Sequence, residues 1–188
     1  MTDIADSQPK LHQHGVEIQR FDQLRELPIG LDAEVRAEMA EMLNRILADT
    51  RILHDLYKKH HWLMRGHTFY SLHLLMDKHA EEQEALIDKI AERIQTLGAI
   101  AVGDPRHVAE LTHIERAPDG AEEVPAMLSR TLEAHEHIIK EAREGAELAD
   151  EKGDPTTNDL LSSAVLPVNE LQTWFVAEHL VDTPLVEA

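Results

Sequence analysis

The chain has 188 residues, a formal net charge of −18, 13 histidines and no cysteine. The lack of cysteine excludes a disulfide framework, a thiolate zinc site and a thiol nucleophile. The negative charge argues against nucleic acid as the main partner and suits metal cations. The length suits one domain, no apolar run approaches the ~20 residues that span a bilayer, and the first residues do not form a secretory signal, so we expect a cytoplasmic protein with no membrane partner.

The N-terminal part of the chain divides into an arm and two long helices. Residues 1–31 have a mixed pattern interrupted by proline and glycine, which is typical of an arm outside the core. Asp32 can then N-cap a helix, because apolar side chains recur at helical spacing over 33–65 without proline or glycine. A second helix is predicted over 68–96. It should end at Gly98, a residue type favoured just after a helix end.

The second half of the chain begins with a connection of about 23 residues over 98–120, in which we expect a short helix over 105–111. A third long helix is predicted over 121–152. A fourth follows over 155–181, where Pro167 should kink the helix or remove a hydrogen bond.

Four long helices without a strand pattern predict an all-α four-helix bundle over 32–182, followed by a tail at 183–188. The connection between the second and third helices is much longer than a hairpin needs, so it should cross the bundle and leave these two helices parallel. A bundle with one long crossover connection that carries a short helix is ferritin-like.

The second predicted helix carries two pairs of metal-ligating residues. His73 and Asp77 are four residues apart and share a face, and so do Asp88 and Glu92. The eleven residues from Asp77 to Asp88 complete nearly whole turns, so both pairs lie on one stripe, ~16 Å apart along the axis. One metal ion with ligand bonds of ~2.0–2.2 Å cannot contact both pairs of a single chain.

Three explanations of these pairs remain open from the spacing alone. The pairs are unrelated surface groups, or they belong to two separate sites, or a second copy of the helix runs antiparallel across a two-fold axis and creates two identical shared sites. Histidine with carboxylates suits Fe²⁺ or Zn²⁺, and a carboxylate-rich set favours iron. A di-iron site inside one bundle needs Glu-x-x-His on two helices, but we find this spacing only from Glu110 to His113, in the long connection, so we do not expect that site.

The region around the second helix also resembles a known family. It is similar to the signature of the Dps (DNA-protection-during-starvation) mini-ferritins of the ferritin-like superfamily, and the resemblance extends over residues 30–182. The residues that carry it are His61-Trp62-Leu63-Met64-Arg65-Gly66, His73, Asp77, Asp88 and Glu92.

The resemblance implies a dodecameric shell built from two-fold dimers, with a ferroxidase site between subunits. One chain would supply His61, His73 and Asp77, and the other would supply Asp88 and Glu92. The implied reaction is the oxidation of Fe²⁺ to Fe³⁺, preferably by hydrogen peroxide, followed by storage as ferric mineral, which protects against oxidative damage. The alternative is a non-enzymatic metal-buffering or DNA-compacting shell.

Several residues near this motif have two interpretations each. The resemblance implies that Trp62 traps oxidising equivalents, and the alternative is an ordinary packed aromatic. His60, His67 and His79 are extra to the motif. Of these, His67 and His79 are candidates for a further metal position, especially for zinc as a competitor of iron, and the alternative is solvent exposure.

The segment from Glu110 to Asp159 has 14 acidic and 5 basic residues, which is half of the net charge of the chain. A solvated face is the default interpretation. The resemblance implies that acidic residues at the end of the third helix and the start of the fourth line three-fold pores that admit iron. The pore candidates are Asp150, Glu151, Asp154 and Asp159.

DNA binding is predicted to be weak or absent at neutral pH, which also makes nucleoid association doubtful. The arm has three basic residues against five acidic ones, and the tail has no basic residue. A shell with a charge of −18 on every chain would repel DNA at ordinary salt. His12 and His14 gain charge as the pH falls, so weak binding below about pH 6 is conceivable.

Overall fold

The computed structural model describes residues 8–11 and 13–182, so His12 and the tail at 183–188 lie outside the described residues. The described part is helical and contains no strand, which confirms the predicted all-α bundle. Its elements are α1 (Ala33–Leu63), α2 (Phe69–Thr96), α3 (Pro105–Leu111), α4 (Val124–Glu151), α5 (Pro155–Leu160), a π-helical turn η2 (Leu161–Val165), α6 (Leu166–Ala177) and a 3₁₀ turn η3 (Glu178–Leu180).

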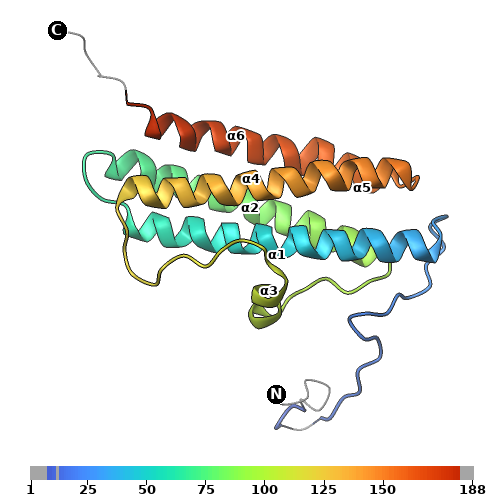
Figure 1. Ribbon diagram of the computed structural model, residues 1–188. Helices are drawn as coiled ribbons and strands as arrows, with labels where there is room; N and C mark the ends of the chain where they lie inside the picture. The colour runs from blue at the N-terminus through green and yellow to red at the C-terminus, as the bar shows by residue number, and fades with distance from the viewer. Residues whose placement is uncertain (1–7, 12, 183–188) are drawn as a thin grey trace.

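The path of the chain is the predicted crossover topology (Figure 1). Helices α1 and α2 form an antiparallel pair, and the long connection then returns along the outside of α1 before α4 begins. Helix α4 therefore runs parallel to α2, and the rod formed by α5 and α6 runs back beside it. The short predicted helix is α3, which lies against the outer side of α1.

Gly98 ends α2 in the way that the sequence predicts. Gly98 adopts a left-handed φ of 90°, its N–H donates to Gln95, and the N–H of Ala99 donates to Ile94. This pair of bonds satisfies carbonyl groups that the end of α2 would otherwise leave free. A Cβ atom at Gly98 would also lie 2.4 Å from the backbone oxygen of Arg25, so only glycine fits there.

The N-terminal arm is partly held against the bundle. The N–H of Arg25 donates to the backbone oxygen of Gly98 at 2.8 Å, and Arg36 of α1 donates to the backbone oxygen of Arg25 at 2.9 Å. Asp32 occupies the N-cap position of α1 as predicted, although its side chain accepts no capping hydrogen bond. Residues 8–11 and 13–31 lie outside the helices.

The predicted disturbance at Pro167 appears as the π-helical turn η2. Proline has no N–H and its ring crowds the carbonyl one turn earlier, so the regular hydrogen-bond ladder cannot continue through it. The N–H of Leu166 instead donates to Leu161, five residues back, and the side chain of Asn169 donates to the backbone oxygen of Val165 at 2.8 Å. The continuous helical segment formed by α5, η2 and α6 therefore extends across the proline. No helix of the described residues is long and apolar enough to cross a bilayer.

Candidate metal centre

Two histidines from neighbouring helix ends lie face to face at one end of the bundle. His61 belongs to the last turn of α1 and His73 to the second turn of α2, and the short loop between these helices brings them together. Their rings stack with centroids 3.7 Å apart and planes inclined by 21°. Both side chains are partly exposed, so the pair lies at the surface of the chain.

Hydrogen bonds to the backbone fix the proton on each of these rings. Nδ1 of His61 lies 2.7 Å from the backbone oxygen of His73, and Nδ1 of His73 lies 2.9 Å from the backbone oxygen of His61. A carbonyl oxygen can only accept, so each Nδ1 carries the hydrogen and donates it. The lone pair of the neutral ring is then on Nε2, the atom that such a histidine offers to a metal ion.

Asp77 adds a carboxylate one turn further along α2. Its Oδ1 lies 3.9 Å from Nδ1 of His61 and accepts a hydrogen bond from Nζ of Lys58 at 2.5 Å. This hydrogen bond is the main reason why the pKa of Asp77 lies below its ordinary value, and the charge of Lys58 acts in the same direction. Asp77 therefore stays ionised, and Lys58 is the positive charge with which a metal ion must compete.

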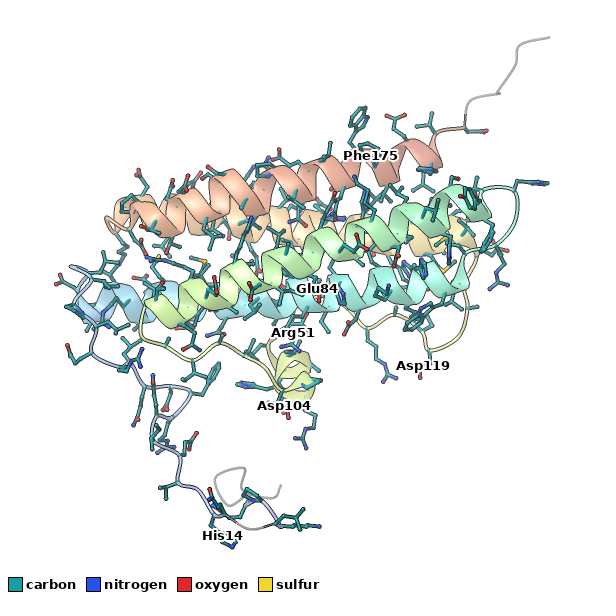
Figure 2. All side chains as sticks on the ribbon, turned by 180° about the vertical axis from the view of Figure 1, so that it is seen from behind. His14, Arg51, Glu84, Asp104, Asp119 and Phe175 are labelled. Atoms are coloured by element: carbon teal, nitrogen blue, oxygen red, sulfur yellow. The ribbon has the colours of Figure 1, made fainter. Side chains whose placement is uncertain are left out.

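Asp88 and Glu92 are exposed on the same helix, further from the histidine pair. Figure 2 labels Glu84 near the middle of α2, between the two groups. The rise from Asp77 to Asp88 is ~16 Å. The structure thus brings the two histidines and Asp77 together, and within one chain it does not bring Asp88 and Glu92 to them.

Large apolar side chains are exposed around this half-site. Trp62 is 70% exposed and Tyr70 is 73% exposed, so neither packs in the core of its own chain. Phe69 and Leu74 are also exposed next to them. Several large apolar side chains exposed within a short stretch of chain are typical of a protein–protein contact.

Comparisons with known proteins identify the family of this chain. The ferritin family model, described as a ferritin-like domain, matches residues 40–186. The structure of DpsC from Streptomyces coelicolor has 64% sequence identity and a TM-score of 0.90, covering 91% of this chain and 99% of that chain. The chain belongs to the Dps family of ferritin-like proteins.

More distant relatives cover most of the chain as well. A nutrient stress-induced DNA-binding protein from Nostoc sp. is 33% identical over 89% of this chain and 91% of its own length. A Dps protein from Vibrio cholerae O1, titled a member of a broad superfamily of ferritin-like diiron-carboxylate proteins, has 25% identity and a TM-score of 0.77, covering 82% of this chain and 96% of that chain.

The extra histidines of this Dps protein have different surroundings. His79 is 1% exposed and its Nδ1 lies 3.1 Å from the hydroxyl of Tyr57 inside the bundle. His60 is also buried, with Nδ1 3.1 Å from the hydroxyl of Thr131. His67 is exposed in the loop before α2. The structure corrects the expectation of a further metal position on His67 and His79, because one ring is in the core and the other faces solvent.

The four pore candidates differ in their exposure to solvent. Asp154 is 1% exposed, caps α5 by accepting from the backbone of Thr157, and accepts from Arg93 Nη2 at 2.7 Å. Both oxygens of this carboxylate have internal partners, so the expected pore role of Asp154 is replaced by a structural one. The remaining pore candidates are exposed near the turn from α4 to α5: Asp150, Glu151 and Asp159.

One group of metal-ligating residues was not predicted. Asp49, His113, His137 and Glu141 each offer a ligand atom, and these atoms lie within 4.8 Å of one another. The only signal in the sequence is the spacing of four residues from His137 to Glu141, which occurs by chance on many helices. Asp49 and His113 lie far from it in the sequence and join it only through the fold.

Proposed function

We propose that this protein is a ferroxidase and iron-storage protein, which oxidises Fe²⁺ preferably with hydrogen peroxide and holds ferric mineral inside a shell of twelve copies. The observation that carries the proposal is the half-site on α2 and the end of α1: two histidines whose Nδ1 atoms donate to the backbone, which leaves Nε2 for a metal ion, beside the ionised Asp77. This donor set suits Fe²⁺, and it has too few ligands to hold the ion firmly by itself.

A second copy of the chain would complete the half-site. If α2 of the second copy runs antiparallel across a two-fold axis, its Asp88 and Glu92 lie opposite the two histidines and Asp77 of the first. The operation is symmetric, so it creates two such sites per dimer. The exposed Trp62 and Tyr70 beside the half-site support this arrangement, because burying them against another subunit is favourable.

Iron is the substrate in this proposal. Two Fe²⁺ ions each lose one electron, one hydrogen peroxide accepts both, and its O–O bond breaks to leave the oxygen atoms as water or hydroxide. Hydrolysis of the Fe³⁺ product then releases protons and forms the mineral. Because both electrons reach the same peroxide, no hydroxyl radical is released. The carboxylates are hard anionic ligands that favour Fe³⁺, and the histidines help to hold Fe²⁺.

Iron would enter the shell through pores lined by exposed acidic residues near the turn from α4 to α5. Asp150, Glu151 and Asp159 lie in this region. A ring of symmetry-related carboxylates concentrates cations and steers them inward.

Complementation between two inactive variants tests the shared site. We expect Asp77→Asn and Glu92→Gln each to slow the peroxide-dependent rise in ferric absorbance at least about tenfold, with Glu84→Gln as an exposed control on the same helix. When the two inactive chains are co-assembled in equal amounts, about a quarter of the sites combine two intact halves and should regain activity. A mixture of separately assembled shells should regain none.

Several outcomes would overturn the proposal. Native rates in both single variants would remove these residues from the reaction, and no recovery after co-assembly would contradict a site shared between chains. Iron binding without oxidation would indicate a metal-buffering shell instead. Light scattering that shows a monomer or a simple dimer at neutral pH would contradict the shell.

A further inference from the structure

A second group of metal-ligating side chains lies away from the half-site, between α1, the connection after α3, and α4. Asp49 comes from α1, His113 from the connection, and His137 and Glu141 from successive turns of α4. Their ligand atoms all lie within 4.8 Å of one another. None of these residues belongs to the proposed ferroxidase site, so this group is independent of it.

Asp49 is the most buried member, with a side chain that is 0% exposed. Its Oδ1 accepts hydrogen bonds from the hydroxyl of Thr112 at 2.5 Å and from the N–H of His113 at 2.8 Å. Its Oδ2 is buried and has no hydrogen-bond partner. A buried polar atom without a partner is costly, so this oxygen needs a positively charged or hydrogen-bearing neighbour.

The neighbours that face this oxygen carry unpaired buried atoms of their own. Nε2 of His137 lies 3.2 Å from Oδ2 of Asp49 and 3.4 Å from Oε1 of Glu141, without the geometry of a hydrogen bond to either. Oε2 of Glu141 is also buried without a partner. Burial and the nearby charge of Asp49 raise the pKa of Glu141, because a buried carboxyl group close to a second carboxylate is harder to ionise.

We propose that Asp49, His113, His137 and Glu141 form a second metal site, contained in one chain, for a divalent first-row cation such as Zn²⁺ or Fe²⁺. Two imidazoles and two carboxylates are a suitable four-ligand set for either ion. The cation would satisfy the unpaired atoms and compensate both carboxylates at once. Ligand bonds of ~2.0–2.2 Å require the donors to move closer together by about 1 Å.

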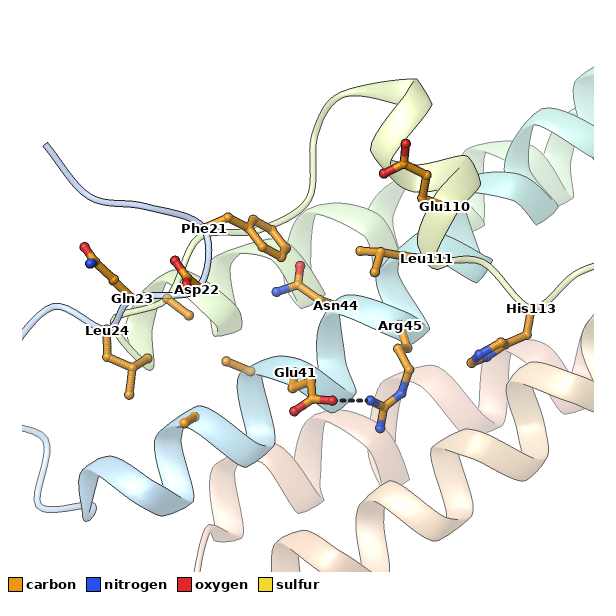
Figure 3. A pocket seen from close by; sticks show the side chains of 13 residues that line it. Phe21, Asp22, Gln23, Leu24, Glu41, Asn44, Arg45, Glu110, Leu111 and His113 are labelled. Atoms are coloured by element: carbon orange, nitrogen blue, oxygen red, sulfur yellow. Dashed lines mark hydrogen bonds and ion pairs between the residues drawn. The ribbon is translucent and has the colours of Figure 1, made fainter. Parts of the chain in front are cut away.

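The surroundings allow both this movement and the entry of an ion. The side chain of His113 is 52% exposed and that of His137 is 35% exposed, so both rings can adjust. A hollow of about 240 Å³ is lined by both of these histidines. A larger pocket of about 500 Å³ is also lined by His113 and reaches past Asn44 to Phe21 (Figure 3). Solvent therefore reaches the exposed side of the group, and Asp49 forms its floor.

A metal ion here would cross-link three segments of the chain. Its ligands would join the long connection to α1 and α4 near the point where α3 ends. Because the ion would bind the folded chain and not the unfolded one, binding should raise the melting temperature.

The test uses the whole protein with the other site disabled by His61→Ala and Asp77→Asn, after removal of metals with a chelator. Co²⁺ serves as the probe, because its visible absorption rises strongly when it enters a four-ligand site of histidine and carboxylate. We expect one Co²⁺ per chain, displaced by Zn²⁺ or by anaerobic Fe²⁺, and a higher melting temperature with the metal bound.

Glu141→Gln is the matched variant, because the amide can donate a hydrogen bond to Asp49 and preserve the fold without metal. We expect it to bind Co²⁺ at least about tenfold more weakly and to lose the rise in melting temperature, while exposed Glu144→Gln on the same helix binds like the parent. A cooperative melt of metal-free Glu141→Gln shows that it folds. Equal Co²⁺ binding by Glu141→Gln and the parent, or no binding by the parent, would overturn the proposal in favour of a carboxyl–carboxylate hydrogen bond between Glu141 and Asp49.

Discussion

The hydroxyl of Tyr57 lies 2.5 Å from Nε2 of His135 in the centre of the bundle, where both side chains are 0% exposed. Nδ1 of His135 lies 2.9 Å from Oδ1 of Asn169, whose amide nitrogen donates to the backbone oxygen of Val165. Oδ1 of Asn169 must therefore accept, so His135 donates from Nδ1 and accepts the hydroxyl proton of Tyr57 on Nε2. His79 then donates from Nδ1 to the oxygen of Tyr57 at 3.1 Å.

These buried histidines should make the free energy of unfolding depend on pH. Burial lowers the pKa of His135 to about 3 and that of His79 to about 4, against about 6.5 in the unfolded chain. Between the folded and unfolded pKa values only the unfolded chain binds protons. These histidines therefore leave the free energy of unfolding unchanged above pH 6.5 and lower it as the pH falls towards 4. We expect a loss of up to about 2 kcal/mol per histidine between pH 7 and pH 5, measured by urea unfolding.

The quantity to compare between variants is the slope of the free energy of unfolding against pH, because replacing a buried histidine also lowers stability at every pH. His135→Gln should flatten the fall between pH 7 and pH 5, and the exposed His67→Gln should leave it unchanged. An equally steep fall in both variants would show that His135 does not cause the pH dependence of the free energy of unfolding.

His61→Asn should separate metal binding from folding. The amide nitrogen of asparagine can occupy the position of Nδ1 and keep the bond to the backbone of His73, but nothing replaces Nε2. We expect the initial ferroxidase rate to fall at least about tenfold, while the melting temperature changes by only a few degrees. A rate near that of the native protein would mean that Nε2 of His61 is not a ligand.

Lys58→Met should strengthen cation binding at the half-site. The ammonium group of Lys58 holds Asp77 in the position where a metal ion would compete for the carboxylate. Both side chains are about one-third exposed, so solvent screens this pair and the expected gain is about threefold to tenfold in affinity. Isothermal titration with Zn²⁺ measures it, with exposed Lys89→Met as the control. Weaker binding in Lys58→Met would show that the lysine assists the site.

Asp154→Ala should destabilise the bundle, whereas Asp150→Asn should not. Removing Asp154 leaves the guanidinium of Arg93 partly buried without its partner and removes the cap of α5, which together cost about 3 kcal/mol or more. Asp150 is exposed, so its substitution should change stability by less than about 0.5 kcal/mol. If Asp150 lines a pore, this variant should instead slow iron uptake, which stopped-flow absorbance detects.

DNA binding should be weak at neutral pH, although the Nostoc relative is named as a DNA-binding protein. The arm offers few positive charges, and Arg20 lies 3.8 Å from Asp22. A gel shift with plasmid DNA at pH 7.5 and moderate salt should show no tight complex. A tight complex under these conditions would contradict the electrostatic argument.

The parts of the fold that depend on neighbours along the chain were predictable from the sequence. Apolar spacing located the long helices to within a few residues, Gly98 marked the end of α2, and the length of the connection predicted the parallel arrangement of α2 and α4. These features follow from local hydrogen bonding and from burial of one helix face. The exact form of the disturbance before Pro167 was not predictable, because a kink and a π-helical turn both accommodate proline.

The sequence by itself determined the helices, their order and the spacing along α2 of the pair His73 and Asp77 and the pair Asp88 and Glu92. Only the tertiary structure decided which polar residues enter the core, as His79 and Asp154 do, and which distant segments meet, as Asp49, His113 and His137 do. The reason is physical: helical periodicity assigns a residue to a face of its own helix, whereas burial and ligand convergence depend on what the rest of the chain places against that face.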